Sequence, residues 1–548
     1  MASITDASDD ATHRPWGLYA AVAVAVALRV WGLSFGMPHP EARPDESVLI
    51  ALALDVLRGD LNPEFFNYPS LFIYVLAGLY GLLYLAARAS GLVISVDHFA
   101  ATMAADPTPL YLCARLLSVA CGAATVVVVY LLGRRLHSHR TGLVAAWLLA
   151  VNYLHVRESH FGVTDVPLTL LTAAAVTAAA RASVTARTRD FGIAGAIAGL
   201  AVSTKYNAVL LALPLLEAAT AASSGRLPRA LARATVAGVA MIATALAATP
   251  FAVLDWATFQ RDVLFEMRHL QVGHAGVDLG RGWIRHALFT LPLGTGVPAL
   301  IAAAMGAVLF VRRRPWLGLL AWSFPVAYYV VAGSARVVFV RYMVPITPFL
   351  AVAAAMGVVM IMHALPWPRS PRSRSGGIIV AVLVLIAAPL GRVIAFDRVL
   401  SRRDSRVVAA EWLAREFPAG ASIYQAGSPY EHLQLTTSHE ARLFDEQRES
   451  FVGSDRVARG QPDWIVLPQS PSPYSKVPPA VQRLVARCYT RVLHVPGAGM
   501  APAAAFDLQD AFFVPYSDPA LIERPGPDIL ILMRDPTRCG PSDAPAER

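Results

Sequence analysis

The sequence predicts an α-helical polytopic membrane protein with about 11 to 12 membrane helices, followed by a soluble C-terminal α/β domain. Three observations lead to this fold class. The chain has 548 residues, of which 55% are hydrophobic and only 16% are charged. Its apolar runs repeatedly exceed the roughly 20 residues that cross a bilayer. Beyond residue 397 these long runs stop and shorter amphipathic segments take their place.

The net charge of +9 does not indicate a nucleic-acid partner, because the basic residues lie in short clusters between apolar runs. Such clusters are expected in cytoplasmic loops. The clusters are "RRLHSHR" (134–140), "RASVTARTR" (181–189), "GRLPR" (225–229), "RRR" (312–314) and "PRSPRSR" (368–374). We therefore attribute the charge to membrane topology and expect membrane lipids, not nucleic acid, around the protein.

Twelve apolar segments can be read along the chain. They are 17–35, 69–89, 108–133, 141–156, 166–181, 190–203, 206–222, 230–248, 286–311, 315–333, 342–363 and 376–396. The first has no cleavage site after it, so we expect a retained span and a cytoplasmic N-terminus. The linker 90–107 has two acids and no Lys or Arg, which favours an external position. A cytoplasmic N-terminus and an external linker are compatible only if 69–89 returns to the outer face. This leaves about eleven crossings.

This topology defines a membrane domain of residues 1–397 with three external loops, 36–107, 157–165 and 249–285. The short apolar pair within 190–222 then forms a hairpin with "STKYN" at its outer apex. The tail, 398–548, is predicted to be an extracytoplasmic domain. Its strand-like runs are "ASIYQ", "DWIVL", "RVLHV" and "DILILM". Cys488 and Cys539 in this tail form one disulfide or remain two unpaired thiols.

The first external loop contains adjacent acids, Asp45 and Glu46, in "RPDESVLIALALDVL". One interpretation is structural, with Asp45 as an N-cap and Glu46 in a first turn that the helix dipole favours. The alternative is catalytic, because an acid near the membrane interface is costly and a carboxylate there can deprotonate a hydroxyl. Tyr68, in "FFNYPSL", would line the same site.

The second external loop, "RESHFGVTDVPLTL", contains His160 and Asp165. Asp165 is again either an N-cap or a functional acid on the same face as Asp45. Carboxylates at positions 45 and 165 could hold a divalent metal such as Mg, Mn or Zn. The chain has no compact metal-ligand motif such as HExxH, so the metal remains an open alternative.

Cationic side chains gather in the remaining external segments. Arg268, His269 and His274 lie in the third loop, where solvated histidines are the simpler interpretation. Lys205 stands at the hairpin apex, and Arg341 with Tyr342 begins the run "RYMVPITPFL". Each of these side chains could merely anchor a helix end at the interface. Together they would bind a phosphate leaving group, whose oxygen gains negative charge in the transition state.

These segments resemble a known superfamily. The stretches "PDESVLIALALDVLRGD…FFNYPSL", "SHFGVTDVPLTLL", "STKYNAVLLALPLL" and "RYMVPITPFLAV" occur in the order seen in GT-C membrane glycosyltransferases. The resemblance is to the branch with protein O-mannosyltransferases and the aminoarabinose transferase of lipid A. It covers most of residues 17–365. The chain differs from the aminoarabinose branch at Asn67, Tyr68 and Pro69, where that branch has a Lys-Pro-Pro-like turn. This difference argues against a lipid A substrate.

The resemblance implies inverting transfer of one sugar from a polyprenyl-phosphate carrier to a hydroxyl on a lipid, glycan or protein acceptor. It implies Asp45 as general base, Glu46 as its acidic neighbour and Asp165 as the acid of the second loop. The third loop would handle the carrier phosphate, through His269 or His274. The chain would then lie in a bacterial inner membrane, with its reaction on the extracytoplasmic face.

The main alternative is a multi-pass transporter or flippase of a lipid-linked or small anionic substrate. Such proteins place ionisable residues inside their spans and contain repeats, whereas this chain shows no repeat and keeps its acids in loops. Arg29, within the first span, is an exception that either pairs with a backbone carbonyl or approaches a donor phosphate. A purely anchoring role for so many apolar segments is disfavoured.

Overall fold

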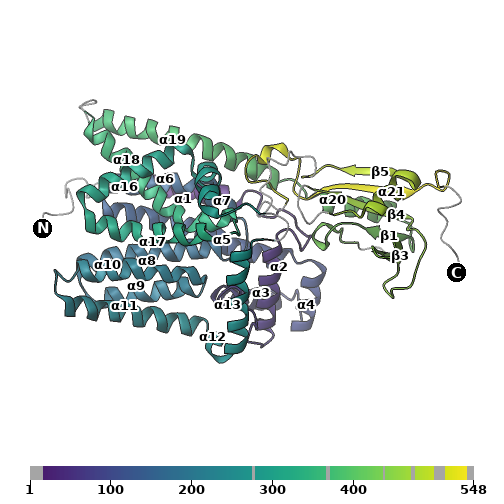
Figure 1. The fold of residues 1–548 in the computed structure, drawn as a ribbon, viewed down its shortest axis with the longest axis horizontal. Coiled ribbons are helices and arrows are strands. Elements are labelled where there is room, and N and C mark those ends of the chain that lie inside the picture. The colour runs from purple at the N-terminus through teal and green to yellow at the C-terminus, as the bar shows by residue number, and fades with distance from the viewer. Residues whose placement is uncertain are drawn as a thin grey trace. The chain divides into compact units, whose positions relative to one another are not determined.

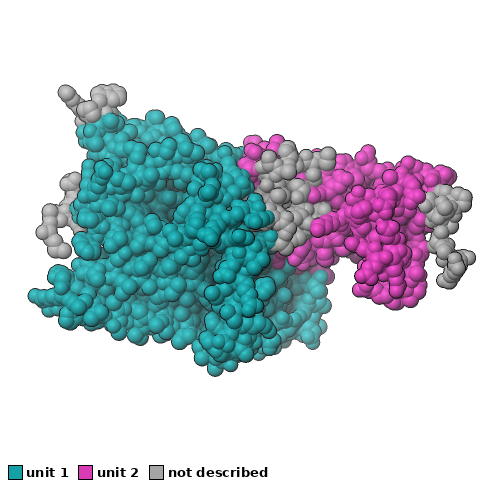
Figure 2. Space-filling model, viewed as in Figure 1, with its two compact units in different colours: residues 1–31, 45–104, 109–394 teal, residues 32–44, 105–108, 395–548 magenta. Residues whose placement is uncertain are grey.

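The computed structural model describes residues 16–274, 278–365, 371–435, 438–470, 476–498 and 513–539. The chain forms two compact units, shown in Figure 2. Unit 1 comprises residues 1–31, 45–104 and 109–394, and unit 2 comprises 32–44, 105–108 and 395–548. The division that we predicted, after residue 397, lies close to the last of these boundaries.

Unit 1 is helical. Its first helices are α1 (Trp16–Val30), α2 (Pro44–Leu57), α3 (Leu71–Ala89), α4 (Val96–Ala105), α5 (Thr108–Leu136), α6 (His139–Ala150), α7 (Tyr153–Glu158), α8 (Asp165–Thr185), α9 (Thr188–Val202), η1 (Tyr206–Leu211), α10 (Ala212–Ala221) and α11 (Leu227–Ala248). The later ones are α12 (Phe251–Leu254), α13 (Trp256–Val272), α14 (Gly282–Arg285), η2 (His286–Thr290), α15 (Leu291–Thr295), α16 (Val297–Arg313), α17 (Pro315–Ser334), η3 (Val340–Ile346), α18 (Thr347–Ala364) and α19 (Pro371–Leu400).

Seven of the described helices are long and apolar enough to cross a membrane, or eight if a bent pair counts as one span. This confirms a multi-pass membrane protein. The number predicted from apolar runs is higher because four of those runs form shorter helices. These are α1, α6, α9 and α10.

Helix α3 has the length and composition of a span, but Figure 1 shows it crossing the direction of α8, α9 and α11 instead of following it. Helices α2 and α13 take the same transverse direction beside it. This is the orientation expected of a helix that lies at the outer face. The non-crossing position of 69–89 in a membrane stays a prediction.

The segment 286–311, predicted as one apolar run, is broken. Its two helical parts, Gly282–Thr295 and Val297–Arg313, meet at an angle of 106°. The break falls at Gly296, whose φ of +88° suits glycine and no residue with a Cβ. Pro298 follows in the first turn of α16, where its missing N–H costs no helical hydrogen bond.

Unit 2 is built round a six-stranded sheet with the strand order β3-β2-β1-β4-β6-β5. Its elements are α20 (Ser405–Glu416), β1 (Ser422–Gln425), β2 (Glu440–Asp445), β3 (Ser450–Val452), β4 (Trp464–Gln469), α21 (Pro479–Cys488), β5 (Tyr489–Val495) and β6 (Asp528–Arg534). Strand β1 is parallel to β2 and β4, and the remaining pairs are antiparallel. The predicted α/β tail is confirmed.

The sheet has an apolar core on each face, because successive side chains of a strand point to opposite sides. Ile423 packs into a cluster with Leu413 of α20, while its neighbour Tyr424 packs into a second cluster with Val481 of α21. Cys488, at the end of α21, is bonded to Cys539, with 4.7 Å between the Cα atoms. The disulfide alternative is therefore the one that the structure adopts.

Candidate active site

Asp45 lies in the first turn of α2, directly after Pro44. Proline suits the first helical position, and a carboxylate in the first turn interacts favourably with the helix dipole. The Oδ2 atom of Asp45 is 2.8 Å from Nη1 of Arg341 in η3. The Asp45 side chain is 31% exposed, and that of Arg341 only 8%. This carboxylate is therefore oriented by a cation and still reachable from outside.

Glu46, one residue further on, is fully buried. Arg115 of α5 donates two hydrogen bonds to its two carboxylate oxygens, at 2.8 and 2.7 Å. The backbone N–H of Gly162 donates a third, at 2.7 Å. Such a bidentate pair fixes geometry, because the guanidinium fork matches the carboxylate. Glu46 thus joins α2 to α5 and to the second loop beneath the exposed face of Asp45.

Asp165, the first residue of α8, is paired with the hairpin apex. Nζ of Lys205 donates to Oδ1 of Asp165 at 2.5 Å, and both side chains are mostly buried. The same ammonium lies 5.8 Å from the ring centre of Tyr68 and 5.3 Å from that of Tyr342. Aromatic faces attract a cation at these distances. Four predicted site residues from four chain segments therefore meet at one ammonium group.

The Tyr68 hydroxyl connects the two acid–cation pairs. Burial is the main factor that raises its pKa well above the usual value, and the charge of Asp45 is the second. Arg341 acts in the opposite direction. Asp165 and Glu266 raise the pKa further. Both acids act on this hydroxyl and Lys205 lies against the Tyr68 ring, so the two pairs border the same space.

Residues of the third loop reach this space through an aromatic path. The His269 and His274 rings are 5.6 Å apart between centres, and His274 lies 5.2 Å from Phe339. The Arg341 guanidinium is 4.2 Å from the centre of the Phe339 ring. His274 is therefore connected through Phe339 to the cation that holds Asp45, and His269 lies behind His274, so the alternative between the two histidines remains open.

The backbone of the first loop is held by hydrogen bonds to α13 and to the hairpin around Lys205. The N–H of Phe66 donates to Asp262 of α13 at 2.9 Å, and the carbonyl of Phe66 accepts from the Tyr206 hydroxyl at 2.9 Å. The N–H of Leu71 donates to the carbonyl of Ser203 at 3.1 Å. Tyr68 lies between these anchors, which explains how a proline-containing turn holds its ring against Lys205.

Two predicted residues are not brought to the site. His160 is fully buried, with its ring nitrogens 3.0 Å from the backbone carbonyl oxygens of Val156 and Trp31. Burial lowers its pKa to about 4, although both carbonyls oppose this. Arg268 is exposed on α13, outside the contacts described above. Residues 275–277 of the same loop lie outside the described part of the chain.

Arg29 adopts the first of its two predicted roles. Its guanidinium donates to the backbone carbonyls of Ala25 and Ala150, at 2.9 and 3.0 Å. It also donates to the Ser159 hydroxyl at 3.2 Å and lies 2.9 Å from a ring nitrogen of His155. A charged group inside an apolar helix is thereby bonded in the interior of unit 1.

The metal predicted at Asp45 and Asp165 stays unconfirmed. Among the residues that the structure describes, no group of three or more His, Cys, Asp or Glu side chains is placed to hold a metal ion. Asp45 faces a guanidinium and Asp165 faces an ammonium. A divalent cation instead takes several oxygen ligands free of such competing cations. The arrangement suits an anionic ligand near Lys205 and Arg341 better than a metal.

Sequence reasoning missed three residues of this site, Arg115, Glu266 and Phe339. Arg115 lies within an apolar run, and a charge in such a run is itself a signal of function or buried pairing. Phe339 lies two residues before the "RYMVPITPFL" stretch and resembles a core aromatic. No local signal separates Glu266 from the other polar residues of amphipathic α13.

Residues 111–264 match the family model described as dolichyl-phosphate-mannose-protein mannosyltransferase. No curated protein sequence gives a significant match to the chain. ArnT from Cupriavidus metallidurans, solved bound to undecaprenyl phosphate, is similar with a TM-score of 0.53 and 16% identity, covering 96% of this chain and 100% of that chain. The apo ArnT structure has the same TM-score and identity, with 96% and 99% coverage.

The apo oligosaccharyltransferase of Archaeoglobus fulgidus gives a TM-score of 0.49 and 13% identity over 75% of this chain. This chain spans 62% of the length of that protein. The family-model match and the ArnT fold confirm the resemblance and the fold class that the sequence predicted. They favour an enzyme over a transporter.

Proposed function

We propose that this chain, with its GT-C membrane glycosyltransferase fold, transfers a single sugar from a polyprenyl-phosphate donor to an acceptor hydroxyl. The observation that carries the proposal is the pair of acid–cation contacts, Asp45 with Arg341 and Asp165 with Lys205, around the Tyr68 hydroxyl. They provide an accessible base and buried positive charge in one space. The family-model match and the ArnT fold support the same reaction class.

The reaction is a single displacement. The acceptor hydroxyl gives its proton to the Asp45 carboxylate while its oxygen bonds to the anomeric carbon of the sugar. The bond between that carbon and the phosphate oxygen breaks, and its electron pair leaves with the phosphate. Attack opposite the leaving group inverts the configuration. Asp45 suits the base role because it is the more exposed of the two adjacent acids.

Lys205 and Arg341 are the cations that would bind the donor phosphate. Both are held by carboxylates and by aromatic rings, so they are oriented before the donor arrives. Preoriented charge in a partly buried site stabilises the developing charge of a leaving group better than mobile surface charge does. Tyr342, which faces Lys205, and the His269–His274 pair complete the phosphate side of the site.

Glu46 and Asp165 act as positioning residues. Each carboxylate is buried and has a cationic partner, so neither is free to meet an acceptor. Glu46 holds the start of α2, and with it Asp45. Asp165 holds the ammonium of Lys205.

The site would lie on the extracytoplasmic face of a bacterial inner membrane. Arg134, Arg181 and Arg313 lie near the ends of α5, α8 and α16, around a cavity remote from Asp165, which agrees with the positive-inside rule. The Cys488–Cys539 disulfide supports an oxidising compartment for the tail. The acceptor is a hydroxyl of a lipid, glycan or protein.

The test replaces Asp45 with Asn in the full-length chain. We expect turnover to fall about 100-fold or more, the usual effect of losing a general base. Binding of undecaprenyl phosphate, followed by native mass spectrometry, should change little. Transfer is measured with a panel of undecaprenyl-phosphate monosaccharides and a bacterial envelope extract as the acceptor source.

The matched control is Asp55→Asn, an acid on the same helix whose partner is the surface residue Arg58. Its turnover should equal that of the wild type. Near-normal transfer by the Asp45 variant would refute the base assignment. Failure of the wild type to release sugar from any prenyl-phosphate donor would remove the proposed function.

A further inference from the structure

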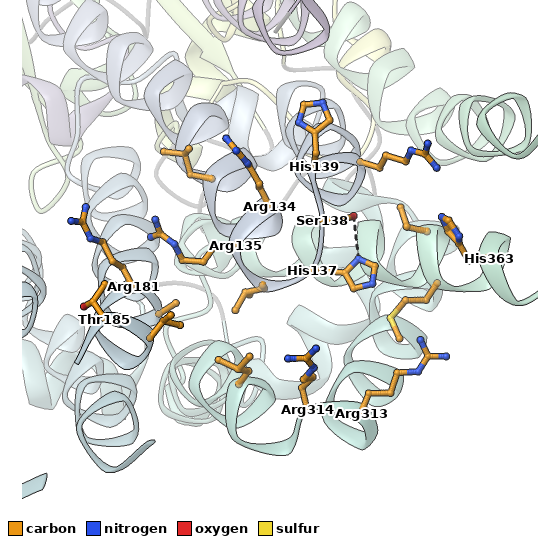
Figure 3. A pocket seen from close by; sticks show the side chains of 18 residues that line it. Arg134, Arg135, His137, Ser138, His139, Arg181, Thr185, Arg313, Arg314 and His363 are labelled. Atoms are coloured by element: carbon orange, nitrogen blue, oxygen red, sulfur yellow. Dashed lines mark hydrogen bonds between the residues drawn. The ribbon is translucent and has the colours of Figure 1, made fainter. Parts of the chain in front are cut away.

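A cavity of about 880 Å³ opens at the opposite ends of the helices that build the candidate site. Its lining residues come from the junction of α5 and α6, the end of α8, the junction of α16 and α17, and the end of α18 (Figure 3). Helix α8 runs from Asp165 to Thr185, and its 21 residues rise about 30 Å. The cavity is therefore one bilayer thickness away from Lys205 and Asp165.

The lining is strongly basic. Six arginines and three histidines are among its 18 residues, and none of these described residues is Asp or Glu. Figure 3 shows Arg134 and His139 on one side of the group of lining residues and Arg313 and Arg314 on the other. Arg181 of this lining pairs with Asp190 at 3.6 Å.

The positive charges also act on one another. Burial lowers the pKa of His137, and the nearby charges of His363, Arg313 and Arg314 lower it further. Such mutual repulsion shows that these groups, from three separate helical segments, converge on one space. The positive-inside rule explains why arginines are at this end of the helices. The rule does not explain why these arginines line one cavity, because arginines in solvated loops would lie apart.

The remaining lining is apolar. Leu131, Val184 and Leu317 contribute aliphatic side chains between the arginines. A cavity with cations and an apolar wall suits an amphiphile whose anionic head enters and whose chains stay at the membrane. Arginine also forms paired hydrogen bonds with phosphate oxygens.

We propose that this basic cavity binds a phosphate-bearing anion at the end of unit 1 that is predicted to be cytoplasmic, separate from the candidate active site. Basic pockets between membrane helices on that side are typical binding places of anionic lipid head groups. The shared chemistry is a phosphate mono- or diester. Its source is either a lipid head group or a soluble phosphate.

The experiment uses the delipidated full-length chain in a neutral detergent. Thermal unfolding is measured during titration with phosphatidylglycerol, with phosphatidylcholine as the zwitterionic comparison, and separately with inorganic pyrophosphate. We expect a saturable rise of the melting temperature with phosphatidylglycerol and none with phosphatidylcholine. A rise with pyrophosphate alone would assign the site to soluble phosphate. Equal shifts with both lipids and none with pyrophosphate would overturn the proposal.

The decisive variant is Arg313→Gln with Arg314→Gln, which should weaken the apparent affinity for the responding anion at least tenfold. The matched control, Arg226→Gln with Arg229→Gln, removes the same charge from exposed arginines outside the cavity and should bind as the wild type does. If the double variant does not fold, Leu131→Trp narrows the cavity without changing its charge and should also weaken binding. Unchanged affinity in a folded cavity variant would refute the site.

Discussion

At the residue scale, two adjacent acids have different environments. The Asp45 side chain is 31% exposed and pairs with Arg341, whereas Glu46 is buried and accepts three hydrogen bonds. The difference arises because neighbours on a helix point about 100° apart, so one faces α5 and the other faces the site. Sequence alone presents them as an acidic pair.

Removing the charge of Glu46 should lower the folding stability of the chain more than it changes the chemical step. Glu46→Gln leaves the Arg115 guanidinium buried without a counter-charge, which typically costs about 3–5 kcal/mol. We expect a clearly lower melting temperature in detergent, measured by thermal unfolding. Asp45→Asn should lower the melting temperature less than Glu46→Gln does, because the Asp45 side chain is 31% exposed and water reaches this pair. A wild-type melting temperature for Glu46→Gln would show that the buried pair is not structural.

At the element scale, small residues determine how closely the helices pack. Helix α9 packs against α11 through Gly195 and Gly199, where an added Cβ would lie 2.1 and 2.4 Å from backbone carbonyl oxygens. Helices α16 and α18 meet in the same way at Gly306 and Gly357. Small residues are common at such contacts because membrane helices associate mainly by close packing.

This packing predicts different results for two glycines of one helix pair. Gly195→Val places methyl groups against the backbone of α11, which cannot move aside cheaply, and should destabilise the chain by about 1–3 kcal/mol or more. Gly238→Val, on α11, meets no atom within 4 Å and should be tolerated. Monodispersity and thermal unfolding of the purified variants provide the measurement. Equal behaviour of the two variants would contradict the packing assignment.

At the scale of the whole molecule, topology decides which residues share a face. Among the described residues, Asp45, Asp165, Lys205 and Arg341 meet at one end of unit 1, and the basic cavity lies at the other. Helix α8 contributes to both, with Asp165 at its first position and Arg181 near its last turn.

Cysteine accessibility tests this topology. Single cysteines replace Ala100, Arg187 or Glu416 in a chain whose free Cys113 and Cys121 have been changed to alanine. We expect positions 100 and 416 to react with an impermeant maleimide from outside intact cells. Position 187 should react only after permeabilisation. Labelling of position 100 from the cytoplasm alone would show that 69–89 crosses the membrane.

The sequence by itself determined the class of the molecule and much of its outline. Apolar runs and basic clusters are local signals, because each span must satisfy its own backbone hydrogen bonds and each loop its own charge. They indicated the long apolar helices of unit 1, the α/β tail and the acids at the starts of α2 and α8, but not helices such as α4 and α13.

Only the tertiary structure decided which of these residues work together. It paired Asp165 with Lys205, buried Glu46 against Arg115, removed His160 from the site and surrounded a cavity with arginines. The break at Gly296 is likewise not visible in the apolar pattern, whereas the charges of the flanking loops predict that 69–89 does not cross. Contacts between residues far apart in the chain depend on how the helices pack, and no local pattern encodes that packing.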